Sequence, residues 1–596
     1  MERRHIHNVI LVVILMFVGE TAFSQRPTVR IDSIHIYKKI ENYSNKSKFT
    51  RFAYNLVFRS YTVKPRKKKP IQKPYSGFEG KFIRRITIVT LDPFGNSIGD
   101  TIDAHLNFLS KAGNSMHLKT QSITIRNLLL IRPKQRFDSL LVKESERLVR
   151  SRPFIRDVSF FVKTVSAKSD SVDIAIRVLD NWSIIPEVHV SPVSTTFNLT
   201  DQNFLGTGHE FMNGISRDIP HGMNTYRTNY SVPNISNTYV SATLHYETDG
   251  NNNFNKSVVI DRPFYSTFAK WAGGISVIDM RLVQSPLNFR TVTEDYWAGQ
   301  AQQLTVGNSV EKRLTNFITT TRYLHVRYLE KPLPQNDPLH FFSNETFFLT
   351  GIGLSNRKYV QDKYLFKYGI TEDVPVGKVY ALTGGYQTKN FVNRLFWGAR
   401  FSTGNYYPWG YLSSNVEYET FVRHGIAEEG IFNADMKFFT NLFEIGKWKF
   451  RQFVKPQLTV GINRFASDSL TLNDGFGIDG FSSTKLSGSS RFLLSFQTQA
   501  YAPWDFIGFR FGPFFTYSLG VLGNAKFSNS KTYSQFGFGV LIKNENLILN
   551  TFQFSFSFYP IMPGSGNNVL KMNSFKTTDF GFSNFEVGKP GPRVFQ

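Results

Sequence analysis

The sequence predicts a mainly β protein, a closed transmembrane β-barrel preceded by one small α+β domain. In residues 551–559, Phe552, Phe554, Phe556 and Phe558 alternate with small neutral polar residues, the period of a strand. Phe and Tyr are abundant, at 58 and 26 of 596 residues, as in the aromatic girdles of barrels. No internal apolar run reaches the ~20 residues of a spanning helix. One such strand also fits a soluble β-protein, so repetition along the chain must decide.

The N-terminus predicts export. Arg3 and Arg4 precede an apolar stretch at 9–18, and Ala22 and Ser24 hold the small-residue positions of a cleavage site. We therefore expect a signal peptide over residues 1–24. The absence of cysteine excludes a disulfide framework and a thiolate metal site. In an exported chain, the net charge of +25 indicates anionic lipid or a basic lumen, and nucleic acid becomes an unexpected partner.

Residues 25–80 form a basic lead-in. Apolar residues at helical spacing over 34–60 predict one or two short amphipathic helices. Residues 63–80 then mix lysine and arginine with Pro65, Pro70 and Pro74, which predicts a stiff exposed linker. Contact with anionic headgroups and a solvated spacer are equally good interpretations.

Residues 81–183 predict a small module with the order β-α-α-β-β, with Asp138 as an N-cap. The expected strands and helices are 82–91, 121–131, 138–150, 155–165 and 171–179. This order, together with the sequences of residues 137–158 and 171–184, resembles the POTRA module that precedes the barrel in BamA/TamA-like outer-membrane proteins. The resemblance implies that the module binds unfolded client polypeptides by strand addition at an exposed sheet edge. A passive spacer is the alternative.

Residues 184–596 contain recurring alternating segments near the ~9–11 residues of a spanning strand, and closure is needed to pair every backbone group. These segments slightly outnumber the sixteen strands that the resemblance implies, so one or two weak segments are expected to be loops. The residues Asp201, Asn203, Gly206 and Gly208 resemble the family's first barrel turn.

Residues 465–488 form a long insertion with Ile478, Asp479, Gly480 and Phe481 at its tip. The resemblance implies a loop folded into the lumen, whose aliphatic-Arg-Gly-aromatic tip pairs with a wall carboxylate.

Both partners of that ion pair differ here, because Asp479 replaces the arginine and Ser518 stands where the carboxylate is expected. The alternation of the flanking strands points Arg491 and Arg510 into the lumen. We hypothesise that Asp479 pairs with one of these two arginines.

Residues 577–587 alternate Phe580 and Phe582 with small residues, carry Phe585, and run into Pro590. We expect the last barrel strand here, ending early because proline lacks a ladder donor. The resemblance implies that this strand forms a lateral gate with the first strand. Phe595 nearly fits the terminal aromatic recognition signal of the family.

No zinc-protease, serine-hydrolase, phosphate-loop or thiol motif occurs, so we predict a protein that is not an enzyme and has no catalytic residue, metal or cofactor. The resemblance implies assembly of outer-membrane proteins or polypeptide translocation, through capture of client polypeptides and release at the lateral gate. The alternative is a substrate-conducting pore or a structural barrel. We expect the bacterial outer membrane, a periplasmic N-terminal domain, and contacts with bilayer lipid, anionic lipid and accessory lipoproteins.

Overall fold

The computed structural model describes residues 75–93, 98, 114–115, 117–166, 168–190, 194–220, 222–284, 287–304, 309–465, 468–506, 509–524, 530–544, 551–564, 566–573 and 580–595. The expected signal peptide and most of the basic lead-in lie outside these residues. With the exception of Phe506, all described residues belong to one compact unit of the chain. No helix among them is long and apolar enough to cross a membrane.

The first part of this unit is an α+β module with the predicted element order. It consists of η2 (Tyr75–Phe78), β1 (Phe82–Leu91), α5 (Ser122–Arg126), α6 (Ser139–Arg150), β2 (Ile155–Thr164) and β3 (Ser171–Asp180). The sheet order is β1-β3-β2, in which β3 runs parallel to β1 and antiparallel to β2. The Asp138 side chain caps α6, as predicted, by accepting from the N–H groups of Leu140 and Leu141 at 3.0 and 3.3 Å.

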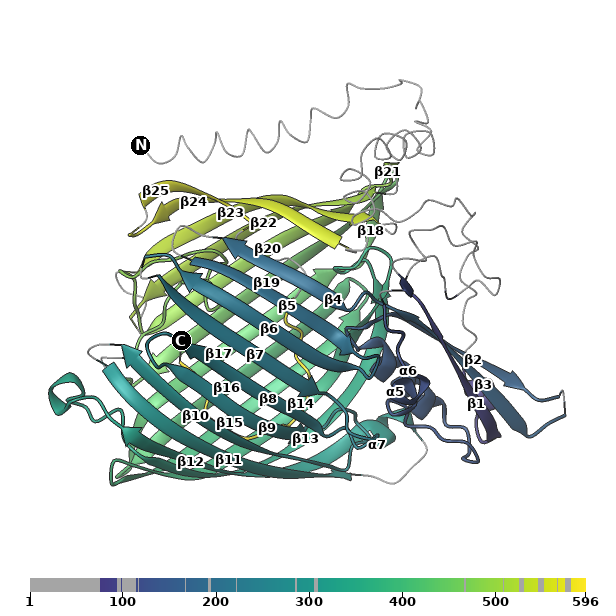
Figure 1. The fold of residues 1–596 in the computed structure, drawn as a ribbon, viewed down its shortest axis with the longest axis horizontal. Helices are drawn as coiled ribbons and strands as arrows, with labels where there is room; N and C mark the ends of the chain where they lie inside the picture. The colour runs from purple at the N-terminus through teal and green to yellow at the C-terminus, as the bar shows by residue number, and fades with distance from the viewer. Residues whose placement is uncertain are drawn as a thin grey trace, which may run out of the picture. The chain divides into compact units, whose positions relative to one another are not determined.

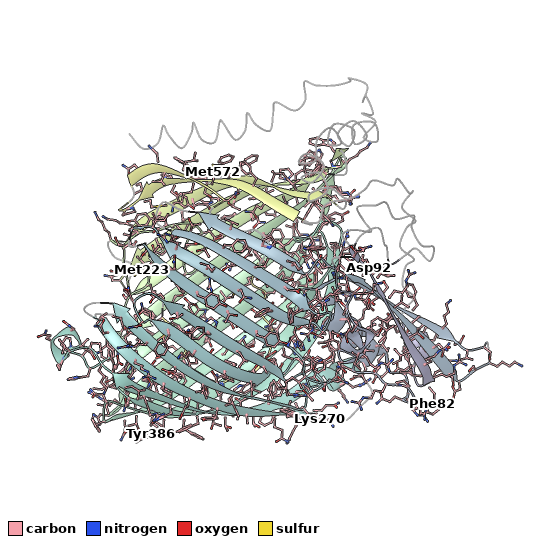
Figure 2. The ribbon with its side chains drawn as sticks, in the orientation of Figure 1. Phe82, Asp92, Met223, Lys270, Tyr386 and Met572 are labelled. Carbon is pink, nitrogen blue, oxygen red and sulfur yellow. The ribbon has the colours of Figure 1, made fainter. Side chains whose placement is uncertain are left out.

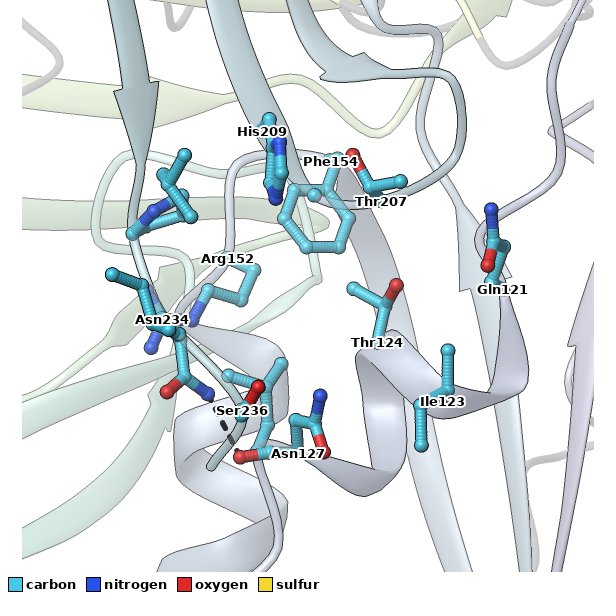
Figure 3. A pocket seen from close by; sticks show the side chains of 15 residues that line it. Gln121, Ile123, Thr124, Asn127, Arg152, Phe154, Thr207, His209, Asn234 and Ser236 are labelled. Carbon is cyan, nitrogen blue, oxygen red and sulfur yellow. Dashed lines mark hydrogen bonds between the residues drawn. The ribbon is translucent and has the colours of Figure 1, made fainter. Parts of the chain in front are cut away.

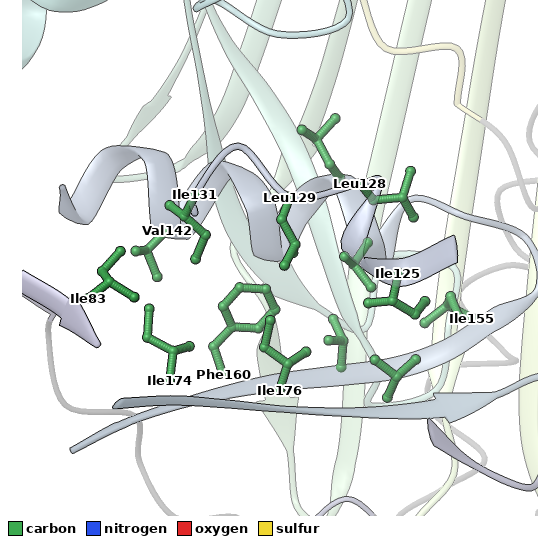
Figure 4. Packing of buried hydrophobic residues seen from close by; sticks show 14 of the residues in the cluster. Ile83, Ile125, Leu128, Leu129, Ile131, Val142, Ile155, Phe160, Ile174 and Ile176 are labelled. Atoms are coloured by element: carbon green, nitrogen blue, oxygen red, sulfur yellow. The ribbon is translucent and has the colours of Figure 1, made fainter. Parts of the chain in front are cut away.

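The core of the module lies between the two helices and one face of the sheet (Figure 4). Ile83 of β1 and Ile174 and Ile176 of β3 meet Val142 of α6 and Phe160 of β2 there, and all are nearly or fully buried. Their period-two spacing along the strands places them on one face of the sheet. The opposite face and the edges of β1 and β2 are not part of this core.

The second part is a closed barrel in which twenty-two strand segments of the described chain follow one another in sequence order, from β4 to β25 (Figure 1). The segments are β4 (Ile184–Val190), β5 (Ser194–Phe204), β6 (His209–Asp218), β7 (Met223–Val232), β8 (Ser241–Asp249), β9 (Phe254–Arg262), β10 (Trp271–Gln284), β11 (Leu287–Gln303), β12 (Thr315–Glu330), β13 (Glu345–Lys363), β14 (Thr371–Lys389), β15 (Val392–Tyr407), β16 (Gly410–Arg423), β17 (Ile426–Thr440), β18 (Phe443–Ile445), β19 (Trp448–Ile462), β20 (Ser490–Tyr501), β21 (Asp505–Phe506), β22 (Phe509–Gly523), β23 (Lys531–Asn544), β24 (Thr551–Met562) and β25 (Gly566–Met572). Short helices α7 (Val310–Leu314) and η3 (Pro334–Asn336) lie in connections.

The expectation of sixteen strands is wrong for the described chain. Only β18 and β21 are short, with three and two residues, and β18 continues the line of β17 along β19. The alternating segments expected between residues 225 and 559 all lie in strands, and β4, β5, β6, β18, β21 and β25 are added to them. The segment expected at 577–587 is the exception, because its described residues, 580–587, form no strand. β25, whose sequence is GNNVLKM, carries no clear alternation, so its periodicity could not indicate it.

The strand β24 shows the predicted alternation of a barrel wall. The side chains of Phe554, Phe556 and Phe558 are 41%, 37% and 37% exposed on the outside, whereas Ser555 and Ser557 are fully buried on the inside. Figure 2 shows the barrel with its side chains; Met223 lies toward one end and Lys270 toward the other. An outer face of phenylalanine suits contact with hydrocarbon.

Residues 580–595, called the lumen segment below, do not form the predicted last strand. The last strand is β25, and the lumen segment has no regular secondary structure. It contacts side chains on the inner face of strands β11 to β19. Its alternating phenylalanines therefore fill interior pockets rather than face lipid, and Pro590 and Pro592 suit a chain that donates to no ladder.

Candidate functional site: a barrel lumen occupied by the chain's own residues

The first end of the lumen segment lies in an aromatic cluster on the inner wall. Phe580 is 5.1 Å from Phe453 of β19, measured between ring centroids. Phe582 packs edge-on against Tyr411 of β16 and Phe439 of β17, at 5.6 and 5.9 Å. Aromatic pairs in such geometry add about 0.5–1.5 kcal/mol each beyond the burial of their surface.

The middle of the lumen segment fits recesses that glycines leave in the wall. Phe585 is fully buried, and a Cβ added at Gly404 of β15 would overlap its ring. A Cβ at Gly353 of β13 would come within 2.8 Å of Val587. The absence of side chains at these wall positions therefore makes room for the segment.

Charges along the lumen segment are matched by charges on the wall. Glu586 forms an ion pair with Arg357 of β13 at 2.5 Å, and Arg593 with Glu417 of β16 at 2.8 Å. Lys589 pairs with Asp295 of β11, and this carboxylate also binds Arg322 of β12 at 2.8 Å. The pairs that include Glu586 and Lys589 are only partly exposed, which reduces the screening that weakens surface pairs.

Side chains of the wall also hold the backbone of the lumen segment. Ser355 Oγ donates to the carbonyl of Phe585 at 2.7 Å, and Arg322 Nη1 donates to that of Pro590 at 3.0 Å. The backbone N–H of Arg593 donates to Glu419 of β16 at 2.6 Å. Arg464, which follows β19, lies 4.3 Å from the ring centroid of Phe595 in a cation–π contact.

The long loop after β19 folds inward, and its tip is buried against β20, β22, β23 and β24. Phe481 is fully buried, with ring centroids 5.7 Å from Tyr533 and 6.3 Å from Tyr559, and Ile478 belongs to the same cluster. Gly480 has φ +69°, its N–H donates to Asp474 at 2.9 Å, and its carbonyl accepts from Lys571 of β25 at 2.7 Å. Backbone bonds and two apolar side chains therefore hold the tip.

The hypothesised ion pair between Asp479 and an arginine is absent among the ion pairs of the described residues. Arg491, on the inner face of β20, donates from Nη1 to the carbonyl of Thr471 at 2.8 Å. Arg510 of β22 lies 5.9 Å from the ring centroid of Tyr368. Ser518 donates to Ser495 at 3.3 Å. Burial raises the pKa of Asp479 above its ordinary value, with the nearby Asp474 adding to the rise.

The glycine-rich turn lies between β5 and β6, so β4 and β5 form an earlier hairpin and this turn is not the first of the barrel. Asn203 is buried, donates to Thr120 of the module at 2.9 Å and accepts from the N–H of Gly208 at 2.8 Å, while the N–H of Asn203 donates to Asp201. Gly206 and Gly208 have φ of +72° and +73°. A Cβ at Gly208 would lie 2.9 Å from Phe154 of the module.

A second contact between module and barrel involves α6. Arg150 donates from Nε and Nη2 to both carboxylate oxygens of Asp373 of β14, at 2.8 and 2.9 Å. Arg147 stacks over Tyr359 of β13 at 4.1 Å from the ring centroid. The bidentate ion pair of Arg150 and Asp373 fixes both the distance and the orientation between α6 and β14.

Beside the contact between the module and the glycine-rich turn, a pocket of about 300 Å³ opens between α5 and the turn after β7 (Figure 3). Thr124, Arg152 and His209 line it. Asn234 donates to the carbonyl of Asn127 across one side at 2.8 Å. The pocket leaves part of the junction unfilled.

The sequence reasoning missed the wall residues of this site. Asp295, Arg357, Glu417 and Glu419 lie in strands whose alternation was recognised, but nothing in the sequence marks them as partners of residues some 170–300 positions further along the chain. The available signal was the charge on Glu586, Lys589 and Arg593, at the end of and just after the segment that was expected to be the last barrel strand.

No protein-family model matches the chain, and no curated protein matches it in sequence. Among solved structures, it is similar to BamA from Haemophilus ducreyi lacking POTRA domains 1–3, with 12% identity, coverage of 83% of this chain and 84% of the other, and a TM-score of 0.30. It is similar to CdiB from Acinetobacter baumannii at 9% identity, 92% and 98% coverage and a TM-score of 0.35. For CdiB from Escherichia coli the values are 10%, 90% and 96%, and 0.38.

Proposed function

We propose that this protein is a BamA/TamA-like barrel of the bacterial outer membrane that inserts or translocates polypeptides. The observation that carries the proposal is a small module whose sheet has an exposed edge strand. This module is joined directly to a closed barrel through the ion pair of Arg150 and Asp373. The proposal includes a POTRA role for the module, a periplasmic position for it, and unfolded client polypeptides as partners. Anionic lipid at the basic lead-in and accessory lipoproteins are further proposed partners, and catalysis is not part of the function.

Client capture is assigned to the edge of β1. Among the described residues, the order β1-β3-β2 gives the strand β1 a neighbour on one side only, and residues 134–137 cover just its first residues. The N–H of Ile83 donates to the carbonyl of Gln135 there, at 2.9 Å. Beyond this point Val89 is 44% exposed. An added client strand gains backbone hydrogen bonds that depend little on its sequence.

Release into the membrane is assigned to the seam between β25 and β4, where the ring closes. Each of these strands has seven residues, whereas the neighbouring β24 and β5 have twelve and eleven. A shorter pairing has fewer ladder hydrogen bonds and costs less to open. The gate is therefore placed at β4 and β25, not at Phe580, Phe582 and Phe585.

Photocrosslinking tests the proposed function. A crosslinking amino acid at Val89 should capture newly exported outer-membrane proteins in cells, and the same group at Ile123, which is 54% exposed on the helix α5, should not. Depletion of the protein should remove the captured clients from the outer membrane. Equal capture at both positions, or an unchanged outer membrane after depletion, would contradict the proposal.

The alternative of a substrate-conducting pore is disfavoured by the lumen segment and by the inward tip loop, which both occupy interior space. A large and steady conductance of the intact reconstituted protein would favour the pore. A barrel that neither conducts nor captures clients would be structural.

A further inference from the structure

The lumen segment is held in the manner of a bound peptide. Its carbonyl groups accept from wall side chains, including Ser355 at Phe585 and Arg322 at Pro590. Bonds to backbone atoms recognise any extended polypeptide, because every residue presents the same groups. The wall surface from β11 to β19 is therefore built to accept a chain that is not a strand of the barrel.

The side-chain recesses of this surface define the chemistry of what fits. Phe580 and Phe582 enter one aromatic cluster, and Phe585 enters the recess beside Gly404. Wall carboxylates then receive Lys589 and Arg593. The matching ligand is a polypeptide without regular secondary structure that has phenylalanine at two- to three-residue intervals, followed by basic residues.

We propose that the inner wall from β11 to β19 is a binding site for unfolded, phenylalanine-rich polypeptide, and that the lumen segment occupies this site as an internal ligand which a client segment replaces. The inference rests on the proposed function for the identity of the client. Membrane strands of barrels have the required chemistry, because one of their faces is apolar and often aromatic.

Exchange of this kind has a physical basis. The lumen segment is tethered to the same chain, which gives it a high effective concentration at the site. A client that is bound to the module is also held close to the lumen, so its effective concentration at the site is high as well. It can therefore compete with the lumen segment. An untethered peptide should bind only when the internal ligand is removed.

The test uses the full chain and a variant truncated after residue 579, both reconstituted in lipid nanodiscs. A fluorescent peptide of residues 580–596 should bind the truncated variant, and should bind the full chain at least about tenfold more weakly because the internal copy competes. A peptide with Phe582→Ala and Phe585→Ala should also lose at least about tenfold in affinity, since two buried aromatic contacts are removed. Equal binding of both peptides to the truncated variant would overturn the proposal.

A second measurement keeps the test decisive if the truncated variant fails to fold. In the full chain, Gly404→Ala places a methyl group against the Phe585 ring, so it should displace the segment and raise ion conductance across a planar bilayer. Gly384→Ala is the matched control, because an added Cβ there meets nothing within 4 Å. Conductance that is unchanged in Gly404→Ala would contradict the proposal.

The client step is probed with a peptide of residues 551–559, which has phenylalanine at every second position. This peptide should compete with the labelled peptide on the truncated variant, and a peptide of the same composition with its phenylalanines adjacent should compete less. Failure of the 551–559 peptide to compete would refute client binding. Failure of the depletion experiment alone would instead refute the proposed function and leave the peptide site standing.

Discussion

Replacing Asp373 by asparagine should loosen the module from the barrel. The carboxylate of Asp373 accepts two hydrogen bonds from Arg150, and the two side chains are only 14% and 9% exposed. The asparagine is of similar size but carries no charge and offers one acceptor oxygen. The guanidinium of Arg150 would then keep a single carboxylate partner, Glu146, at 3.2 Å.

The expected cost follows from these contacts. Removing one partner of a buried ion pair costs about 3–5 kcal/mol when the remaining charge has no other partner. Because Glu146 still neutralises part of the charge on Arg150, we expect about 2 kcal/mol, which corresponds to about a 30-fold rise in the opening equilibrium. A double-mutant cycle with Arg150→Gln should give a coupling energy above about 1 kcal/mol.

Hydrogen exchange of α6 in the reconstituted protein measures this opening. Exchange of α6 should accelerate in Asp373→Asn, whereas exchange of β20 should not change. Asp173→Asn is the control, since Asp173 pairs with Arg84, which is 51% exposed, and such pairs contribute below about 1 kcal/mol. Equal exchange in the two variants would refute the reasoning that this junction holds the module.

Three further predictions concern the outer wall, the tip loop and the module. Phe556→Arg should lower barrel stability in lipid vesicles by about 2–4 kcal/mol if the residue lies at mid-bilayer, whereas Phe556→Leu should be nearly neutral. Phe481→Ala removes a fully buried ring at a cost of about 3–5 kcal/mol, so protease should cleave the tip loop faster, while Phe476→Ala, 51% exposed, should leave cleavage unchanged. Burial raises the pKa of Glu146 above its ordinary value of 4.5, so the folded module binds this proton more tightly than the unfolded chain. The module should therefore lose stability as pH rises above 4.5 through the folded pKa, and thermal unfolding of Glu146→Gln should show a smaller loss.

The alternation of apolar and polar side chains predicted the barrel strands, because this alternation depends only on consecutive residues of one strand. Residues of one strand face the outside and the lumen of the barrel in turn, so the alternation of Phe554, Ser555 and Phe556 reveals their strand without any knowledge of the neighbouring strands. The Asp138 cap and the element order of the module were also readable, since caps depend on adjacent residues. The number of strands was predicted wrongly, because the count of sixteen followed the resemblance although more alternating segments were present, and because β25 has no alternation of its own.

The interior could be predicted only in part. The loop tip with Ile478 and Phe481 was expected in the lumen, and both side chains are buried. The ion pair predicted between Asp479 and Arg491 does not form, because Arg491 donates to the carbonyl of Thr471 instead. Residues 580–587 have the period of a strand, yet that period also suits a peptide in a row of pockets. The ion pairs of Glu586 and Lys589 with strands far away in the sequence distinguish a peptide bound to the wall from a barrel strand.

The lumen segment also constrains the order in which the molecule can form. Its partners Asp295, Arg357 and Glu417 precede it by 294, 229 and 176 positions, and they belong to three different strands. Contacts of such large sequence separation require costly loop closure, so they form late in folding. Docking of residues 580–595 can occur only after the wall from β11 to β16 has formed. Residues 580–595 should therefore become resistant to protease only when the wall is complete. The time at which this resistance appears would mark the end of barrel assembly.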